Sequence, residues 1–522
     1  MIGNDSEANI AQNLFNGLLK FDANLNVAPD IALRLPDISS DGRTYTFRLR
    51  PDVKFSNGDP VTSRDVLYSW SRAAAMQGPF AANLSAIAGY DRVSANQVSG
   101  TALEALLEKQ DPTVTLSGLT APDDQTVVVN LTSASGWFES AIAQHSVAGM
   151  LVDQKVVKND FDGWWKSAAT LIGSGAFELS AHTPGQSYDF AAVPNWWGRP
   201  RPTLKSVHIA VEPDNEAALA KYQQGGFDLL GYAGDGPQAA DVAKLQGSQK
   251  SELLLAVKNK SYWASFNLVA DARRPAGGPF TLDGGKAAHD LRLAFSMSID
   301  RAQLAKDVCA NVTCVAATGG LLSKGLIGYL GDGSDPLATF DPVKARALLE
   351  SADPLGGKSK GLVYTYDPEG PFNDAIARFL RAQWLANLGV TVRLETAPHS
   401  RFITERLNGH YVLSRDGWAA DYNHPQDWFD NLWGAVAGCP DTSCTSGYDT
   451  KAYDQLLAKA DAEPLPASIP DYKTLSRQLI DDVAYIPLFY PVDAFLFKPY
   501  VLGAGSNNMF DYWWNQIQLV SH

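Results

Sequence analysis

Four cysteines are the residues of this chain whose type and spacing could most directly do chemistry. They form two equally spaced pairs, Cys309 with Cys314 and Cys439 with Cys444, each in a segment of loop-like composition. This pattern favours two local disulfides and an oxidising compartment outside the cytoplasm. A zinc site is the alternative, although structural zinc prefers tighter spacing and would need all four thiolates in one place. We expect disulfides, each contributing about 2 kcal/mol to stability.

Residues for catalysis do not occur in recognisable patterns. The sequence has neither a G-x-S-x-G nucleophile elbow nor an H-E-x-x-H zinc motif, and its eight histidines include no i, i+4 pair. A glycine-rich segment at 231–236 has the wrong spacing for a dinucleotide or phosphate loop, so we interpret it as a turn. We therefore expect a protein that is not an enzyme and that needs no metal and no cofactor.

Strand and helix signals alternate in the elements that must position any site. Apolar alternation at 43–50 predicts a half-buried strand, and Thr62 with Asp65 predicts the start of a helix. Residues 363–366, 372–388 and 390–394 predict one β-α-β unit, and the fold class is therefore α/β. The other predicted elements are strands at 126–131, 227–230 and 261–269 and after 172–177, a helix at 216–224, and helical structure at 290–308 that can divide in two.

Composition restricts the partners. The 522 residues exceed one typical domain and predict two or three compact units. The 57 acidic and 43 basic side chains give a net charge of -14, which repels nucleic acid. The most apolar late segment, at 484–497, contains two prolines and is shorter than the roughly 20 residues of a membrane helix. We expect neither a nucleic-acid partner nor a membrane-spanning segment.

Five stretches, in order and over most of the chain, resemble the dipeptide- and oligopeptide-binding proteins of bacterial ABC importers, which form solute-binding protein family 5. The C-terminal AYIPLFYP (484–491) also resembles this family. The five stretches are LFNGLLKFD (14–22), DGRTYTFRLRPDVKFSNGDPVTSRDVLYSW (41–70), GSGAFELSAHTPGQSYDFAAVPNWWG (173–198), LRLAFSMSIDRAQL (291–304) and GWAADYNHPQDWF (417–429).

The resemblance implies a two-lobed type II periplasmic-binding-protein fold with mixed β-sheets and an extra inserted α/β subdomain. The implied first lobe comprises about 1–38, 168–260 and 487–522, the insert about 39–167, and the second lobe about 261–486. The implied function is an extracytoplasmic, monomeric binding protein of an ABC importer that captures short peptides between its lobes and delivers them to a membrane permease. We expect it in the periplasm or cell envelope, as a lipoprotein anchored by an N-terminal segment that this sequence lacks.

Asp421, in the Gly417-Trp-Ala-Ala-Asp-Tyr motif, matches the family position that holds the α-ammonium of the peptide. An enclosed ammonium needs a paired carboxylate, so this residue would select for a free amine. The alternative is that Asp421 caps a helix or faces solvent, because Asp before Tyr-Asn-His-Pro is also good turn chemistry.

The segment before Asp421 resembles the part of the family whose main chain pairs with an extended peptide. It comprises Arg415, Asp416, Gly417 and Trp418, and the glycine permits close approach of the backbone. Arg415 could bind a ligand carboxylate or form a structural ion pair with Asp416, and the sequence leaves both open.

Weaker predictions from the resemblance place further contacts on both lobes. Trp418, Trp428 and Phe429 could line side-chain pockets or belong to the core. The other predicted peptide contacts are Asn16, Gly17 and Leu18 in the first lobe, Phe80 in the insert, Asn267 near the hinge and Tyr490 at the return crossing.

Two other functions compete with peptide binding. One is a binding protein of the same fold for haem, a nickel complex or an oligosaccharide, and the other is an extracellular enzyme. Asp421 favours the peptide hypothesis. The length and sequence of the peptide are not predicted.

Overall fold

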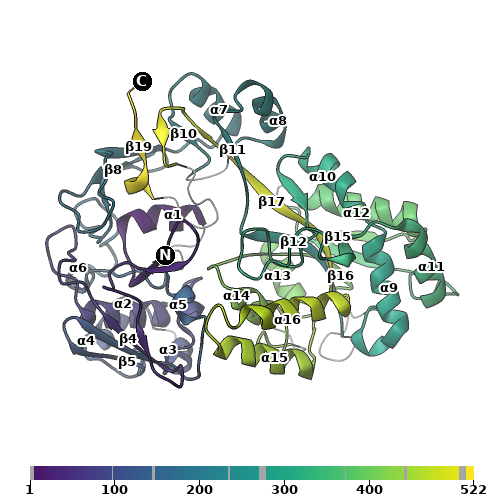
Figure 1. The fold of residues 1–522 in the computed structure, drawn as a ribbon, viewed down its shortest axis with the longest axis horizontal. Helices are drawn as coiled ribbons and strands as arrows, with labels where there is room; N and C mark the ends of the chain where they lie inside the picture. The colour runs from purple at the N-terminus through teal and green to yellow at the C-terminus, as the bar shows by residue number, and fades with distance from the viewer. Residues whose placement is uncertain are drawn as a thin grey trace.

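A mixed sheet of eight strands joins the two halves of the molecule in the computed structural model (Figure 1). The structure describes residues 5–96, 98–143, 147–232, 236–269, 278–370, 372–439, 444–504 and 513–521. The strand order is β10-β17-β12-β16-β14-β15, and β11 and β13 also pair with β17. These strands are β10 (Leu229–Leu230), β11 (Leu253–Val257), β12 (Lys260–Phe266), β13 (Cys314–Ala316), β14 (Val363–Tyr366), β15 (Arg393–Thr396), β16 (Leu413–Ala419) and β17 (Tyr485–Phe497).

Strand β17 crosses from one half to the other. Its first residues pair with β12 and β13, and its last residues pair with β11 and β10. The chain also crosses between the halves at Lys258, which connects β11 to β12. This second crossing lies beside β17, because the N–H of Lys258 donates to the carbonyl of Pro491 at 2.9 Å. Pro487 also lies within β17, where a register shift of β12 between Tyr262 and Trp263 interrupts the ladder. The segment at 484–497 is therefore one long strand.

A four-stranded antiparallel sheet packs with helices in the lower left of Figure 1. Helix α2 (Ser63–Met76) has Thr62 as its N-cap, whose N–H and hydroxyl each donate to Asp65 at 2.8 Å. The predicted strand at 43–50 and the predicted helix start are both confirmed. The elements here are β3 (Asp37–Ile38), β4 (Thr44–Arg48), β5 (Leu119–Asp123), β6 (Thr126–Asn130), α3 (Tyr90–Ala95), α4 (Gly100–Glu108), α5 (Phe138–Ala141) and α6 (Gln154–Asn159).

The rest of this half contains both ends of the chain (Figure 1). A three-stranded antiparallel sheet has the order β7-β8-β9, and the predicted helix at 216–224 is confirmed as α7. The predicted buried strand at 227–230 is only the two half-buried residues of β10. The elements here are α1 (Asp5–Leu14), β1 (Leu19–Phe21), β2 (Val27–Pro29), β7 (Phe177–Thr183), β8 (Ser187–Ala192), β9 (Ser206–Ala210), α7 (Asn215–Gln223), α8 (Ala239–Ser248), β18 (Val501–Leu502) and β19 (Gln518–Leu519).

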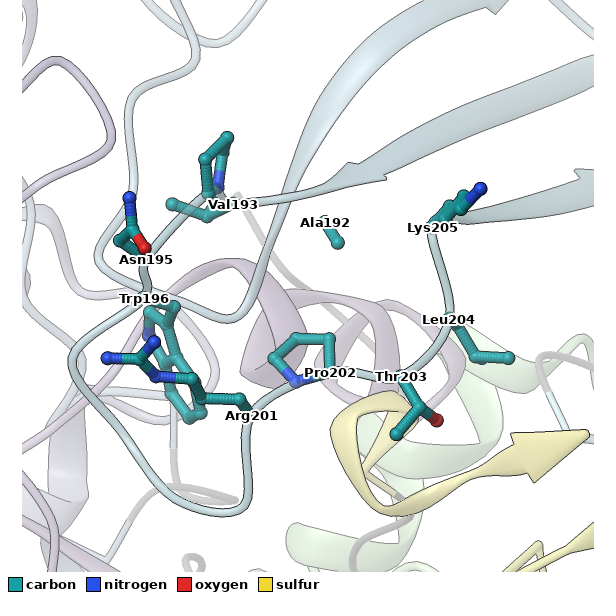
Figure 2. A pocket seen from close by; sticks show the side chains of 10 residues that line it. Ala192, Val193, Asn195, Trp196, Arg201, Pro202, Thr203, Leu204 and Lys205 are labelled. Atoms are coloured by element: carbon teal, nitrogen blue, oxygen red, sulfur yellow. The ribbon is translucent and has the colours of Figure 1, made fainter.

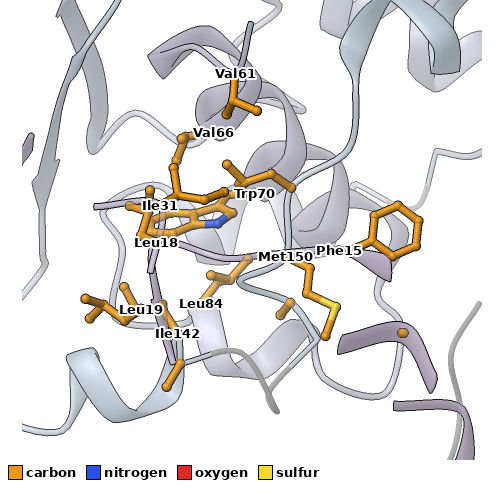
Figure 3. Packing of buried hydrophobic residues seen from close by; sticks show 14 of the residues in the cluster. Phe15, Leu18, Leu19, Ile31, Val61, Val66, Trp70, Leu84, Ile142 and Met150 are labelled. Carbon is orange, nitrogen blue, oxygen red and sulfur yellow. The ribbon is translucent and has the colours of Figure 1, made fainter. Parts of the chain in front are cut away.

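Two large apolar cores lie on either side of the crossing strands. The first core contains residues between Ala11 and Ile517. It includes residues of the N-terminal segment as well as residues of the four-stranded sheet and its helices. In Figure 3, Leu18 and Ile31 of the N-terminal segment lie against Trp70 of α2. The second core lies within 263–489. The four-stranded part therefore shares its core with the rest of its half.

The second half contains the predicted β-α-β unit. Strand β14 and helix α12 (Asn373–Leu388) confirm the predictions, and β14 and β15 are parallel. The predicted strand at 390–394 was placed too early, because Val390 and Val392 are buried before the ladder begins at Arg393. The remaining helices are α9 (Gly285–Met297), α10 (Arg301–Cys309), α11 (Pro342–Ala352), α13 (His399–Leu407), α14 (Gln426–Leu432), α15 (Lys451–Ala462) and α16 (Ile469–Asp481).

All four cysteines are paired as predicted, and the zinc alternative is wrong. Cys309 is bonded to Cys314 and Cys439 to Cys444, with Cα–Cα distances of 5.5 and 4.8 Å. The first loop also bridges the two halves, because its Val312 packs in a small cluster with residues of α8 and β17. This disulfide therefore lies directly beside the crossing strands.

Candidate ligand-binding site

The parallel strands β14, β15 and β16 end at the same edge of the large sheet. Their last residues are Tyr366, Thr396 and Ala419, after which the chain leads into α12, α13 and α14. Ligands of open α/β sheets bind in the crevice outside the carboxyl ends of such strands. The predicted segment 415–421 lies at this edge, which we take as the candidate site.

The end of β16 presents backbone groups that its neighbours leave uncovered. The N–H of Ala420 donates to the carbonyl of Asn259 at 2.8 Å, in register with the pairs that join β16 to β12. Because hydrogen-bonded pairs alternate in an antiparallel ladder, the backbone of Gly417 and Ala419 faces away from β12. On that side, the pairing with β14 reaches only Ser414 among the described residues. The Gly417 N–H on that side donates to the Asp416 carboxylate at 2.8 Å, so the Gly417 carbonyl and the Ala419 backbone are the groups that can pair with an extended chain.

Asp421 lies just past this edge, half-buried beside a second carboxylate. The carboxylate of Asp427 accepts hydrogen bonds from the Asp421 N–H at 3.0 Å and from the Trp418 indole at 3.1 Å. Burial, followed by the charge of Asp421, raises the pKa of Asp427 well above its ordinary value. Asp427 thus holds the backbone of Asp421 in place, in surroundings that disfavour its ionised form.

More carboxyl groups lie behind Asp427. Burial raises the pKa of Asp430 to about 6 and also raises the pKa of Asp461. The amide of Gln426 donates to Asp430 at 2.7 Å, and the hydroxyl of Tyr472 donates to Asp461 at 2.6 Å. Burial therefore makes these interior carboxyl groups harder to ionise, and Asp421 is the member of the group that lies at the edge of the sheet.

The chain that follows Asp421 contacts the other half of the molecule. The side chain of Asn423 donates to the carbonyl of Leu25 at 3.2 Å, and Tyr422 packs in the first core. Figure 1 shows α14, which follows this segment, in the middle of the molecule between the two halves. Asp421 is therefore positioned where both halves could enclose a ligand.

Arg415 forms a structural ion pair, but its partner is not the neighbouring Asp416. Its Nε donates to Asp367 at 2.6 Å, whereas Asp416 pairs with Arg406 and accepts a hydrogen bond from Ser265 at 2.8 Å. Burial opposes ionisation of Asp367, but the hydrogen bonds from Arg415 and His399 prevail and lower its pKa. The side chain of Asp416 is fully buried, so it cannot itself contact a ligand in this conformation.

The predicted contacts at the N-terminus lie inside their half of the molecule. Leu18 is fully buried in the first core, and the carbonyl of Gly17 accepts a hydrogen bond from Ile31 at 3.1 Å. The amide of Asn16 donates to Asp30 at 2.6 Å. These contacts hold the N-terminal segment in place.

The predicted contacts Asn267 and Tyr490 also have structural partners. Asn267 follows the end of β12 remote from the crossing, and its amide donates to carbonyls of Gly409 and Tyr411 at 3.0 and 2.9 Å. Its predicted position near the hinge is therefore wrong. Tyr490 does lie at the crossing, where its hydroxyl donates to the Gly320 carbonyl at 2.6 Å.

The predicted aromatic contacts divide between site and core. Trp428 and Phe429 are fully buried in the second core, which is the alternative that the sequence left open. Trp418 is half-buried at the end of β16. Phe80 is half-buried against the first core. Among these four residues, only Trp418 lies beside Asp421.

Sequence reasoning missed Asp367, His399 and Asp427. Asp367 directly follows the end of β14, and His399 begins α13, three residues after the end of β15. The predicted β-α-β unit could have revealed Asp367, because polar residues after parallel strands gather at one edge. Asp427 lies within the matched stretch 417–429, but no pattern in the sequence distinguishes its carboxylate from that of Asp421.

A separate surface pocket of about 330 Å³ lies between β8 and β9. Figure 2 shows Trp196, Arg201 and Pro202 at the turn that forms it. None of the predicted contacts lines this pocket. Within the described parts of the chain, no group of His, Cys, Asp and Glu could hold a metal ion, and no helix is long and apolar enough to span a membrane.

Comparisons with a family model and with individual known proteins point to the same family. Residues 26–438 match the model of the bacterial extracellular solute-binding proteins, family 5. The chain is 25% identical to the periplasmic murein peptide-binding protein MppA of Escherichia coli K12, over 96% of this chain and 87% of that protein. It is 26% identical to the periplasmic oligopeptide-binding protein OppA of Haemophilus influenzae, over 99% and 90%, and 26% identical to the probable deoxycholate-binding periplasmic protein YgiS of E. coli, over 97% and 88%.

Solved structures show the same fold. The unliganded open form of MppA superposes with a TM-score of 0.79 at 24% identity, over 99% of this chain and 93% of that chain. The complex of H. influenzae OppA with the peptide RPPGFSPFR superposes with a TM-score of 0.69 at 23% identity, over 99% and 94%. The predicted α/β fold, with the two lobes of a periplasmic binding protein, is confirmed.

Proposed function

Because this chain belongs to the bacterial extracellular solute-binding proteins of family 5, we propose that it captures short peptides between its two lobes for an ABC importer. The protein works outside the cytoplasm as a monomer and passes its ligand to a membrane permease without chemical change. A lipid anchor would hold it at the membrane.

The juxtaposition of Asp421 with the Gly417 carbonyl and the Ala419 backbone, which face away from β12, carries the proposal. The carboxylate pairs with the ammonium group of a peptide, and the backbone edge pairs with peptide amides. Neither contact depends on ligand side chains. The arrangement therefore suits a protein that accepts peptides of varied sequence.

The division into lobes follows the two crossings. We place the first lobe at about 1–38, 168–260 and 487–522, the insert at about 39–167 and the second lobe at about 261–486. The separate cores on either side of β17 support rotation of the second lobe against the other two parts as one body. Closure would then bury the ligand and create the shape that the permease recognises.

The test is mass spectrometry of small molecules that copurify with the protein and are released by denaturation. Short peptides in stoichiometric amount are the expected result. A steroid acid, a sugar or a tetrapyrrole in their place would overturn peptide capture and would favour a binding protein for another solute, as the similarity to a probable deoxycholate-binding protein allows.

A further inference from the structure

We propose that Asp367 takes the place of a ligand carboxylate at Arg415, so that the site accepts peptides without reading their C-terminal carboxylate there. The proposal rests on the proposed function and specifies its ligand class. Peptides are recognised through their ammonium group and backbone, and C-terminal amides bind as well as free acids.

The carboxylate of Asp367 is a fixed part of the protein. It is 2% exposed, and it accepts hydrogen bonds from Arg415 at 2.6 Å and from the Asn373 amide at 3.1 Å. The Nδ1 atom of His399 lies 2.8 Å from its other oxygen. Donors from three elements therefore saturate this carboxylate, and Arg415 has an internal anion whether or not a ligand is present.

The second guanidinium group of this region is paired in the same way. Arg406 pairs with Asp416, which also accepts hydrogen bonds from Ser265 and from the Gly417 N–H, each at 2.8 Å. Arg406 and Arg415 lie over the ring of Phe402, at 5.7 and 5.4 Å from its centroid. Both arginines are thus held by an aromatic ring and neutralised by a buried aspartate.

Because Asp367 already neutralises the Arg415 guanidinium through its Nε, a ligand carboxylate would gain the full charge of Arg415 only by displacing Asp367. Displacement would leave a buried anion unpaired, which is strongly unfavourable. The remaining charge at this edge is also negative, because Asp421 lies past β16 and the Glu369 carboxylate accepts a hydrogen bond from the His399 N–H at 3.0 Å. The edge therefore attracts ammonium groups and gives no advantage to a carboxylate.

The experiment uses the full chain, freed of endogenous ligand, and a pool of short random peptides in which each sequence is present as free acid and as C-terminal amide. Native mass spectrometry measures the ratio of acid to amide among bound peptides. We expect a ratio within about five-fold of one for the unchanged protein. We expect Asp367→Asn to raise the ratio by more than about five-fold, because Arg415 then lacks its internal anion.

The control variant is Asp353→Asn, another buried aspartate of the second half whose carboxylate accepts hydrogen bonds from Gly357 and Ser359. It should leave the ratio unchanged. A ratio above about five for the unchanged protein, or an unchanged ratio in Asp367→Asn, would overturn the proposal while peptide capture stands. Failure of the unchanged protein to bind any peptide would overturn the proposed function and this inference together. The first arm needs no variant, so misfolding of Asp367→Asn cannot hide the outcome.

Discussion

The N–H of Asp421 donates to the carboxylate of Asp427 at 3.0 Å, and this contact joins the proposed ammonium site to the start of α14. Asp427 is fully buried, whereas Asp421 is half-buried at the edge of the sheet. Two aspartates six residues apart therefore have different tasks. One can meet the ligand, and the other positions the loop that carries it.

Replacing Asp421 by Asn should weaken peptide binding while leaving the fold intact. An enclosed ammonium without its carboxylate is a buried unpaired charge, which costs about 3–5 kcal/mol, or roughly two to four decades in affinity. N-acetylated peptides should bind the unchanged protein similarly poorly. Titration calorimetry on both pairs measures the effect, with Asp454→Asn as a control remote from the edge. Affinities within a few-fold of the reference in both tests would make Asp421 structural.

Asp427→Asn should be tolerated far better than Asp427→Ala. Burial raises the pKa of Asp427, so a neutral amide resembles the protonated acid and keeps an acceptor for Trp418 and Asp421. Alanine leaves both donors unpaired and should cost about 1–3 kcal/mol of stability. Thermal unfolding and peptide titration of both variants provide the check. Equal losses would show that the charge of Asp427, rather than its hydrogen bonds, matters.

The two disulfides should differ in their effect on binding. Replacing either cysteine pair by serine should lower stability by only about 2 kcal/mol, because each loop is short. The Cys309–Cys314 loop, however, holds Val312 against Val242 and Ala494 beside the crossing strands. Its loss should therefore change peptide affinity, whereas loss of Cys439–Cys444 should not. Equal peptide affinities of the two variants would contradict a role of the Cys309–Cys314 loop at the crossing. As a separate check of the pairing, thiol titration of the unchanged protein should find no free thiol.

His424 should make stability fall as the pH falls below neutrality. Burial lowers its pKa from 6.5 to about 3, so between these values the unfolded chain binds a proton that the folded protein does not. The free energy of unfolding has its full value with respect to His424 above pH 6.5. Protonation of this histidine in the unfolded chain lowers it by on the order of 2 kcal/mol at pH 5. Unfolding of His424→Gln at both pH values tests it. The stability difference between the two proteins should narrow at the lower pH, and a constant difference would show that the histidine does not titrate on unfolding.

Ligand should close the two lobes. Saturating peptide is expected to reduce the radius of gyration in solution scattering. It should also stabilise the fold by about 2.7 kcal/mol when its free concentration is a hundred times Kd. Endogenous ligand must first be removed, since buried peptide can survive purification. An unchanged scattering profile, with binding verified by calorimetry, would argue against a clamp.

Local sequence patterns predicted most of the elements but fewer of the contacts. Strand β14 and helix α12 were found from periodicity, whereas β15 was placed too early because the apolar Val390 and Val392 precede the exposed residues of its ladder. The ion pair of Arg415 could not be predicted, because its partner is separated by 48 residues. The motif located Asp421 at the edge of the sheet, but it could not show that Leu18 is enclosed in a core.

The position of β17 near the end of the chain has a consequence for biosynthesis. Strands β10, β11 and β13 pair only with β17 among the described strands, and all of them are made earlier. Synthesis and export proceed from the N-terminus, so these strands wait without a partner until Tyr485 to Phe497 become available. Until then the two halves are linked by a single crossing. The unpaired strand edges of each half stay exposed during this time, and they are sites at which the chain could aggregate. A nascent chain acquires its complete hinge, and with it the capacity to enclose a ligand, only as one of its last steps.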